Sequence, residues 1–192
     1  MLELYYLFLT YLLASVPTGY LLAALYADVD LRTQGSGNIG ATNAGRVVGT
    51  GVALVTLAGD AFKGWLPVML ASWLNPSGWF LGAVAVTAFL GHCYSGYLEF
   101  RGGKGVATVA GVMLALAPGA TLLAALIWAG VVAGTRRSSL GALVAAGLLP
   151  LLVWWLSTEW LLLTLILAAG VVSRHRENIE RLMAGSERGL GA

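Results

Sequence analysis

Two glycine-rich polar segments of this 192-residue chain contain the residue types that bind anions. Residues 34–46 read QGSGNIGATNAGR, and residues 100–108 read FRGGKGVAT. Glycines let consecutive backbone N–H groups converge on phosphate oxygens, while hydroxyl, amide and basic side chains supply further donors. A helix that begins near Thr42 or Asn43 would also point its positive end towards the anion. The two segments therefore predict phosphate binding.

The first segment supplies most of the candidate ligands, although a flexible loop that binds nothing is the alternative interpretation of its glycines. Residues 35–40 also match the pattern G-x-G-x-x-G. No β-strand precedes them, and a helical chain cannot provide the surrounding βαβ unit, so we reject dinucleotide binding. The candidate substrate-binding residues of this segment are Ser36, Gly37, Asn38, Gly40, Thr42, Asn43 and Arg46.

The second segment places the ammonium group of Lys104 among glycines at the start of a predicted helix. It is not a Walker A motif, because Leu98 stands where the first glycine is required and Gly105 where a hydroxyl should hold magnesium. ATP hydrolysis is therefore disfavoured. The alternative role of Lys104 is that of a charge anchor at the membrane surface. The candidates here are Lys104, Gly102, Gly103, Gly105 and Thr108.

A third polar segment, residues 173–187, reads SRHRENIERLMAGSE and is predicted to be helical. Helical spacing puts His175 and Asn178 on one face. An imidazole can accept or donate a proton near neutral pH. The alternative is a basic amphipathic tail that lies on anionic lipid. Ser139, near the start of another predicted helix, is either a helix cap or a further phosphate donor.

Three ionisable residues fall inside hydrophobic segments. Asp60 and Lys63 are three residues apart, so they share a helix face and are predicted to pair, because an unpaired charge in a membrane is costly. The pair either braces the helix bundle or contributes to the functional site, and the sequence leaves both roles open. His92, within an apolar helix, is more typical of a structural residue.

The composition indicates that a lipid bilayer surrounds the elements that position these residues. Hydrophobic residues make up 58% of the chain and charged residues only 10%, far below the roughly 25% of soluble proteins. A soluble domain and a disordered chain are therefore excluded. A net charge of +2 does not suit a nucleic-acid binder, and a single cysteine excludes an internal disulfide framework and a cysteine metal cage.

The apolar segments predict an all-α membrane helix bundle with about seven transmembrane helices. Residues 106–135 are too long for one untilted crossing, and Pro118-Gly119 would break a helix there, so we expect a hairpin of two short helices. No repeat or linker is apparent, which favours a single domain over residues 1–192. The other predicted crossings are 4–27, 47–74, 79–97, 139–156 and 160–173.

The basic residues predict the orientation of this bundle. With seven crossings, ten of the eleven Lys and Arg residues lie on one face, and Lys63 is the exception. The positive-inside rule then places the C-terminus in the cytoplasm and the N-terminus outside. The ten residues are Arg32, Arg46, Arg101, Lys104, Arg136, Arg137, Arg174, Arg176, Arg181 and Arg188.

Three motifs run in order through the chain: SGNIGATN at 36–43, GGKGVAT at 102–108, and HRENI at 175–179 with GSE at 185–187. Together with GDAFKG at 59–64, they resemble the bacterial acyl-phosphate:glycerol-3-phosphate acyltransferase family. The resemblance implies an integral membrane enzyme that moves a fatty acyl group from acyl phosphate to the sn-1 hydroxyl of glycerol 3-phosphate. Phosphate and lysophosphatidic acid are released. Ala142 departs from the family pattern, which often has serine there.

The resemblance also implies roles for the candidates. We expect Lys104 and the 36–43 loop to hold the acyl phosphate, and Arg46 with His175 and Asn178 to bind the acceptor. Lys104, His175 and Asn178 are the predicted catalytic residues, and Ser139 and Glu187 join the substrate-binding set. Either neutral His175 or a substrate phosphate oxygen accepts the hydroxyl proton, and the sequence leaves both open.

The expected setting is the bacterial cytoplasmic (inner) membrane, with the active site facing the cytoplasm and membrane lipid around the helices. We expect no cofactor, no metal, no nucleic acid and no obligatory protein partner. The alternative function is a small membrane transporter of a phosphorylated solute, because broken helices with glycine-rich ends also build transporter sites. Transporters usually place such sites near the membrane midplane and usually contain internal repeats. In this chain nearly all polar candidates are predicted at one face, and no repeat is apparent.

Overall fold

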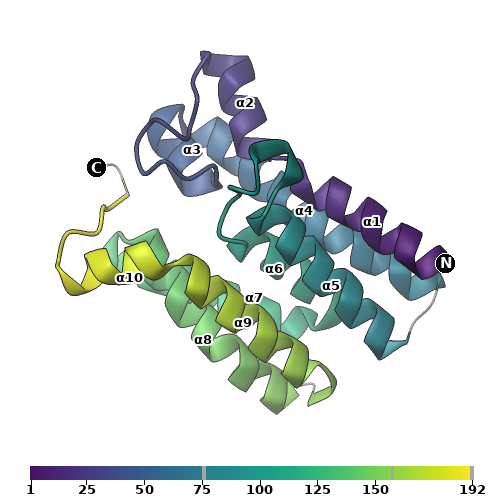
Figure 1. Cartoon of the computed structure of the whole chain (residues 1–192). Helices are drawn as coiled ribbons and strands as arrows, with labels where there is room; N and C mark the ends of the chain where they lie inside the picture. Colours follow the sequence, from purple (N-terminus) through teal and green to yellow (C-terminus); the bar gives the residue numbers. More distant parts are fainter. Residues whose placement is uncertain (75–76, 157, 191–192) are drawn as a thin grey trace. The chain divides into compact units, whose positions relative to one another are not determined.

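The computed structural model describes residues 1–74, 77–156 and 158–190, and the regular secondary structure in these residues is entirely helical (Figure 1). This agrees with the predicted all-α class. The chain forms two compact units, Met1–Val112 and Met113–Ala192, each considered separately below. A single domain over the whole chain stays a prediction.

The first unit packs two pairs of helices on one another: α1 lies against α5, and α2 against α4. The short α3 also lies on α4 (Figure 1). The boundary between the units falls within α6. The helices are α1 (Leu2–Ser15), α2 (Thr18–Ala27), α3 (Ala41–Val47), α4 (Thr50–Leu74), α5 (Gly78–Cys93), the 3₁₀ turn η1 (Gly96–Leu98) and α6 (Val106–Leu116).

The second unit is built on α8, which packs against α7 on one side and α9 on the other. The three helices run side by side in Figure 1, and the shorter α10 follows α9. The elements are α7 (Pro118–Thr135), α8 (Ser138–Leu156), the 3₁₀ turn η2 (Thr158–Trp160), α9 (Leu161–Arg174) and α10 (Arg176–Met183).

Prolines divide two of the predicted segments. The predicted break in residues 106–135 is confirmed, since α6 ends at Leu116 and α7 begins at Pro118. Proline lacks an N–H and disfavours helical backbone in the residue before it. The same chemistry at Pro17 separates α1 from α2, although the sequence had predicted one continuous segment over residues 4–27. Val16 therefore lies at a helix break.

Small residues allow the helices to approach closely, as is typical of membrane bundles. A side chain at Gly91 of α5 would come within 2.8 Å of the Tyr11 carbonyl oxygen of α1. A side chain at Gly111 of α6 would collide with the carbonyl oxygen of Ala61 in α4. The helices of the first unit are therefore held at backbone contact.

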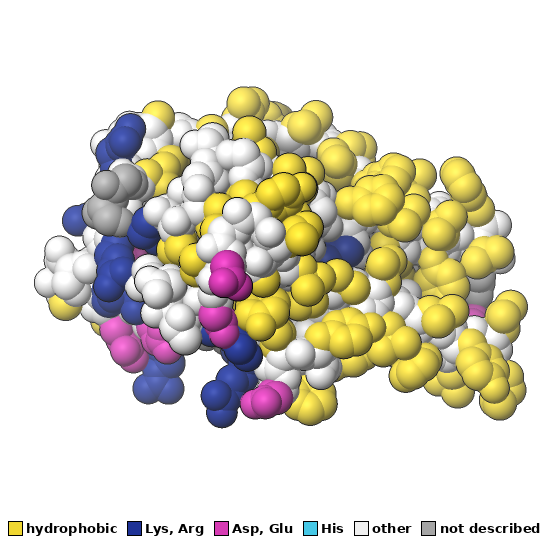
Figure 2. Space-filling view, turned by 90° about the horizontal axis from the view of Figure 1, so that it is seen from above, with side chains coloured by type: hydrophobic (Ala, Val, Ile, Leu, Met, Phe, Trp, Pro, Cys, Tyr) yellow, Lys and Arg dark blue, Asp and Glu magenta, His cyan; other side chains and the backbone are white. Residues whose placement is uncertain are grey.

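The surface of both units suits lipid. Five helical segments are long and apolar enough to cross a membrane among the residues described, counting Leu2–Ala27 as one. Large side chains such as Phe8, Trp79 and Leu126 are exposed, and Figure 2 shows hydrophobic side chains over a broad area. Because α6 and α9 contain only 11 and 14 residues, the seven crossings stay a prediction.

Candidate functional site

The first predicted loop is organised around the buried side chain of Asn43. Its amide nitrogen donates to the carbonyl oxygens of Gln34 (3.0 Å) and Leu31 (3.3 Å), and its oxygen accepts from the backbone N–H of Ser36 (2.8 Å). Asn43 is 2% exposed. Removing a buried amide that satisfies several backbone groups costs more than a typical hydrogen bond. Asn43 therefore stabilises the conformation of the loop.

Several N–H groups of this loop are also used internally. The N–H of Gly37 donates to the Gln34 carbonyl oxygen, and the N–H of Gly40 to the side chain of Asn38. The side chains of Ser36 and Thr42 are exposed, and α3 begins at Ala41, next to the predicted start. The groups of this loop that can reach a substrate are therefore side chains more than backbone amides.

Arg46 stands at the end of α3, where its Nη1 donates to the Asn43 side-chain oxygen at 3.4 Å. This bond draws the guanidinium towards the loop. Since Arg46 is only partly exposed, its charge is screened less than that of a fully exposed residue. The loop and the one cation predicted to serve it therefore form one structural unit.

The second predicted loop lies on the end of α5. The N–H groups of Gly102 and Gly103 donate to the carbonyl oxygens of Cys93 and His92, both at 3.1 Å. A side chain at Gly102 would collide with the His92 carbonyl oxygen, and one at Gly103 with the His92 ring. These two glycines therefore serve close packing, and their amides are not phosphate donors in this conformation.

Gly105 closes this loop before α6 begins at Val106. Its φ of +82° is a conformation that residues with side chains rarely adopt, and a side chain there would also collide with the Phe89 ring. Lys104, between these fixed glycines, is partly exposed. Thr108 is fully buried beside Gly64, so it does not reach solvent in this structure.

The predicted pair of Asp60 and Lys63 is confirmed. Lys63 Nζ lies 2.9 Å from Asp60 Oδ1, and both side chains are 5% exposed. Lys63 also donates to the Val16 carbonyl oxygen at 2.7 Å, at the break between α1 and α2. His92 Nδ1 lies 3.7 Å from the same Asp60 oxygen. The pair thus connects a broken helix to the end of α5.

The break between α1 and α2 anchors both predicted loops of the first unit. The Ser15 carbonyl oxygen accepts a hydrogen bond from Ser95 Oγ at 2.6 Å, just after α5. A side chain at Gly19 of α2 would collide with the carbonyl oxygen of Ile39 in the first loop. Residues 15–19 therefore contact the middle of the first loop, at Ile39, and the turn after α5 that leads into the second.

In the second unit, His175 interrupts the helix that the sequence predicted as continuous. It is the residue between α9 and α10, and it is 3% exposed. Its Nδ1 lies 2.8 Å from the Val171 carbonyl oxygen. A carbonyl oxygen can only accept, so Nδ1 carries hydrogen and Nε2 is the acceptor of the neutral ring. This tautomer suits a general base that acts through Nε2.

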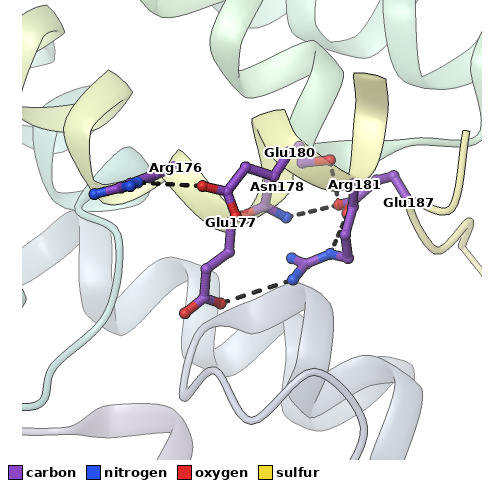
Figure 3. A network of polar contacts seen from close by, with 7 residues as sticks. Arg176, Glu177, Asn178, Glu180, Arg181 and Glu187 are labelled. Atoms are coloured by element: carbon purple, nitrogen blue, oxygen red, sulfur yellow. Dashed lines mark hydrogen bonds and ion pairs between the residues drawn. The ribbon is translucent and has the colours of Figure 1, made fainter. Parts of the chain in front are cut away.

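Glu187 holds Ser139 and Asn178, the other predicted residues of this unit, and Figure 3 shows it with Asn178 and Arg181. One oxygen accepts from Ser139 Oγ (2.5 Å) and Asn178 Nδ2 (2.6 Å), and the other from Arg181 Nε (2.7 Å). A carboxylate repels phosphate, so Glu187 suits the positioning of Asn178 better than direct substrate binding. Ser139 serves the same network.

These contacts lower the pKa of Glu187. Burial alone would raise it, but the hydrogen bonds from Ser139, Arg181 and Asn178 together outweigh burial and hold the pKa below the ordinary 4.5. A lowered pKa means that the contribution of Glu187 to stability is present above about pH 4.5 and is lost as the pH falls through the folded-state value.

We therefore expect Glu187→Gln to reduce the free energy of unfolding by about 1.5–3 kcal/mol at pH 7, the usual range for hydrogen bonds to a charged group. The difference from wild type should shrink as the pH falls below about 4.5, because the wild-type carboxyl is then protonated too. Thermal unfolding of the purified wild type and variant between pH 7 and pH values below about 4.5 measures this difference in stability. Glu180→Gln is the control, since that carboxylate is 59% exposed. A pH-independent difference would contradict the role.

Sequence reasoning missed two residues of these clusters. The Val16 carbonyl lies at the helix break that Pro17 causes, and the helix-breaking proline was the signal that could have revealed it. Arg181 was treated only as part of a basic face, yet it holds Glu187. A carboxylate six residues further along the chain gave no helical spacing to suggest this pair.

Comparison with known proteins agrees with the motifs. A family model described as "Glycerol-3-phosphate acyltransferase" matches residues 4–185. Proteins named glycerol-3-phosphate acyltransferase from Trichlorobacter lovleyi and Geobacter sulfurreducens are 49% and 47% identical to this chain over 179 residues, covering 92% of each chain.

Two crystal structures share the fold. Both are of PlsY (YgiH), described as an integral membrane glycerol 3-phosphate acyltransferase. Its glycerol 3-phosphate form has a TM-score of 0.94 and 35% identity, covering 100% of this chain and 96% of that one. Its lysophosphatidic acid form has a TM-score of 0.90 and 33% identity, covering 98% and 95%.

Proposed function

Because the chain belongs to the glycerol-3-phosphate acyltransferase family, we propose that it transfers a fatty acyl group from acyl phosphate to the sn-1 hydroxyl of glycerol 3-phosphate. The products are lysophosphatidic acid and phosphate. The observation that carries the proposal is the agreement of the whole chain with PlsY in its glycerol 3-phosphate form. The lysophosphatidic acid form of the same relative supports the product.

The proposed location is the bacterial inner membrane. Five helical segments suited to crossing a bilayer, among the residues described, support a membrane protein. The distribution of Lys and Arg supports seven crossings, with the C-terminus and the substrate loops at the cytoplasmic face. The acyl chain of the donor then stays in lipid, while glycerol 3-phosphate arrives from the cytoplasm.

The reaction needs charge stabilisation more than a strong base. The sn-1 oxygen attacks the acyl carbon, and the bond from that carbon to the bridging phosphate oxygen breaks, so phosphate leaves with the electron pair. We assign Lys104 to the departing phosphate, because an ammonium in a fixed loop stabilises the charge that develops there. Phosphate is a good leaving group, so no cofactor or metal is required.

On the sequence prediction, the acceptor is assigned to Arg46 and Asn178, and Ser36 and Thr42 of the 36–43 loop are assigned to the acyl phosphate. Arg46 supplies a fork of N–H donors that fits a phosphate. Asn43 and Glu187 take positioning roles, because their side chains bind the protein itself. Thr108 and Ser139 are the weakest of the assigned substrate contacts, since one is buried and the other bonds Glu187.

His175 has two possible roles, and one substitution separates them. The side chain of glutamine can donate a hydrogen bond but cannot accept a proton near neutral pH. If Nε2 is the base, His175→Gln should lower kcat by about 10²–10⁴-fold. If a substrate phosphate oxygen takes the proton, the loss should be about tenfold or less, the value of one hydrogen bond. Steady-state kinetics of the purified variant measures it.

The function is tested by phosphate release in detergent micelles, where there is no second compartment. We expect purified protein to release phosphate from acyl phosphate only when glycerol 3-phosphate is present. Acyl-CoA should not replace the donor. No release in micelles, together with uptake of glycerol 3-phosphate into vesicles, would instead support the transporter. Release without glycerol 3-phosphate at the same rate would indicate a hydrolase.

A further inference from the structure

A line of buried polar groups runs through the first unit from the α1–α2 break to the Lys104 loop. It begins at the Val16 carbonyl oxygen, which accepts from Lys63 Nζ, and continues through the ion pair to Asp60. His92 is next, with Nδ1 3.7 Å from Asp60 Oδ1. Counted over backbone and side chain together, Asp60, Lys63 and His92 are 3–4% exposed.

The far side of the His92 ring lies against the glycine loop. The three atoms nearest to a side chain built at Gly103 are Nε2, Cε1 and Cδ2 of that ring, and the first of these would collide. The His92 carbonyl oxygen also accepts the N–H of Gly103 at 3.1 Å. Ring and backbone of His92 thus both hold the residue that precedes Lys104.

Burying three ionisable groups is an expensive way to hold helices together. Well-packed apolar residues of similar volume often stabilise a protein as well as, or better than, a buried ion pair. A carboxylate can do what an apolar side chain cannot: at 3.7 Å, beyond hydrogen-bond distance, the charge of Asp60 still favours a hydrogen on the nearer imidazole nitrogen of His92. The buried Asp60–Lys63 pair is therefore suited to holding the His92 ring in one orientation.

We propose that His92, whose ring lies between the Asp60–Lys63 pair and Gly103, is a positioning residue that sets the place of Lys104 through Gly103. The inference rests on the proposed function, in which Lys104 stabilises the departing phosphate. His92 itself does not touch substrate. A displacement of about 1 Å in a catalytic group can cost about 10²-fold in rate. Loss of His92 should therefore act on turnover.

A double-mutant cycle between His92 and Gly103 tests this directly. We expect His92→Ala to lower kcat by about 10–100-fold, with the KM for glycerol 3-phosphate changed less than about threefold. Gly103→Ala should cost at least about tenfold in kcat/KM in the wild-type background, where the new methyl group meets the ring. In the His92→Ala background the same change should cost less than about threefold, because the ring is gone.

The control is Thr164→Val, which removes a buried hydroxyl that bonds the Trp160 carbonyl oxygen in the second unit. It should leave kcat unchanged and add independently to Gly103→Ala. Size-exclusion elution and thermal unfolding verify that each variant is folded. If His92→Ala aggregates, His92→Gln takes its place in the cycle. If neither variant folds, His92 serves stability and the inference is wrong.

Additive losses in folded variants would also overturn the inference, as would a loss confined to the KM for glycerol 3-phosphate. The proposed function fails in a different way. In that case the wild-type protein itself releases no phosphate from acyl phosphate in the presence of glycerol 3-phosphate, before any variant is compared.

Discussion

Lys104→Ala is expected to lower turnover of acyl phosphate by about 10²–10³-fold, the usual cost of removing one group that stabilises charge in the transition state. The glycines on either side hold the loop against α5, so the backbone that carries the ammonium is fixed in place. Lys104→Arg should retain more activity, since the charge is kept while the geometry changes. Phosphate release by the purified variants measures both.

Arg176→Ala is the matched control for this loss. Its side chain is 86% exposed and pairs only with the exposed carboxylate of Glu180 in the contacts described, so its removal should change turnover less than about twofold. Wild-type turnover in folded Lys104→Ala would refute the assignment of Lys104 to the leaving phosphate. An equal loss in Arg176→Ala would point to a general effect of net charge.

The second large effect is expected at the buried ion pair. Asp60→Ala or Lys63→Ala alone should cost about 3–5 kcal/mol of stability, because each leaves an uncompensated charge among buried groups. The double variant should be more stable than either single variant, since no charge is left unpaired. Thermal unfolding and monodispersity in detergent measure the three variants.

The double variant also bears on function. If the pair only braces the helices, the folded double variant should keep its turnover. If the pair orients His92, as inferred above, turnover should fall while the protein stays folded. A double variant that is less stable than both single variants would contradict the pairing energetics, whatever its activity.

The elements of the fold were predictable where one physical constraint dominates. Long apolar segments gave the helices, and Pro118 gave the break at Ala117, because proline cannot continue a helix. The break at His175 was not predictable, since the sequence around it has a regular helical pattern. Tertiary contacts override local preference at such places.

The residue types of the polar clusters could be predicted from the sequence, but the contacts that these residues make could be predicted less well. Spacing alone paired Asp60 with Lys63, because residues three apart share a helix face. The inward use of Asn43, and the contact between His92 and Gly103, depend on segments that are distant in sequence or on loop conformation. Glycines suited to phosphate binding and glycines suited to close packing look alike in a sequence.

The most direct test of acyl transfer follows the sn-1 oxygen. Purified protein is given acyl phosphate and glycerol 3-phosphate that carries a heavy oxygen isotope in its sn-1 hydroxyl, and both products are analysed by mass spectrometry. We predict that the isotope appears in the ester of lysophosphatidic acid, formed in equal amount with unlabelled phosphate. Phosphate formed without labelled ester would contradict the transfer of the acyl group to glycerol 3-phosphate.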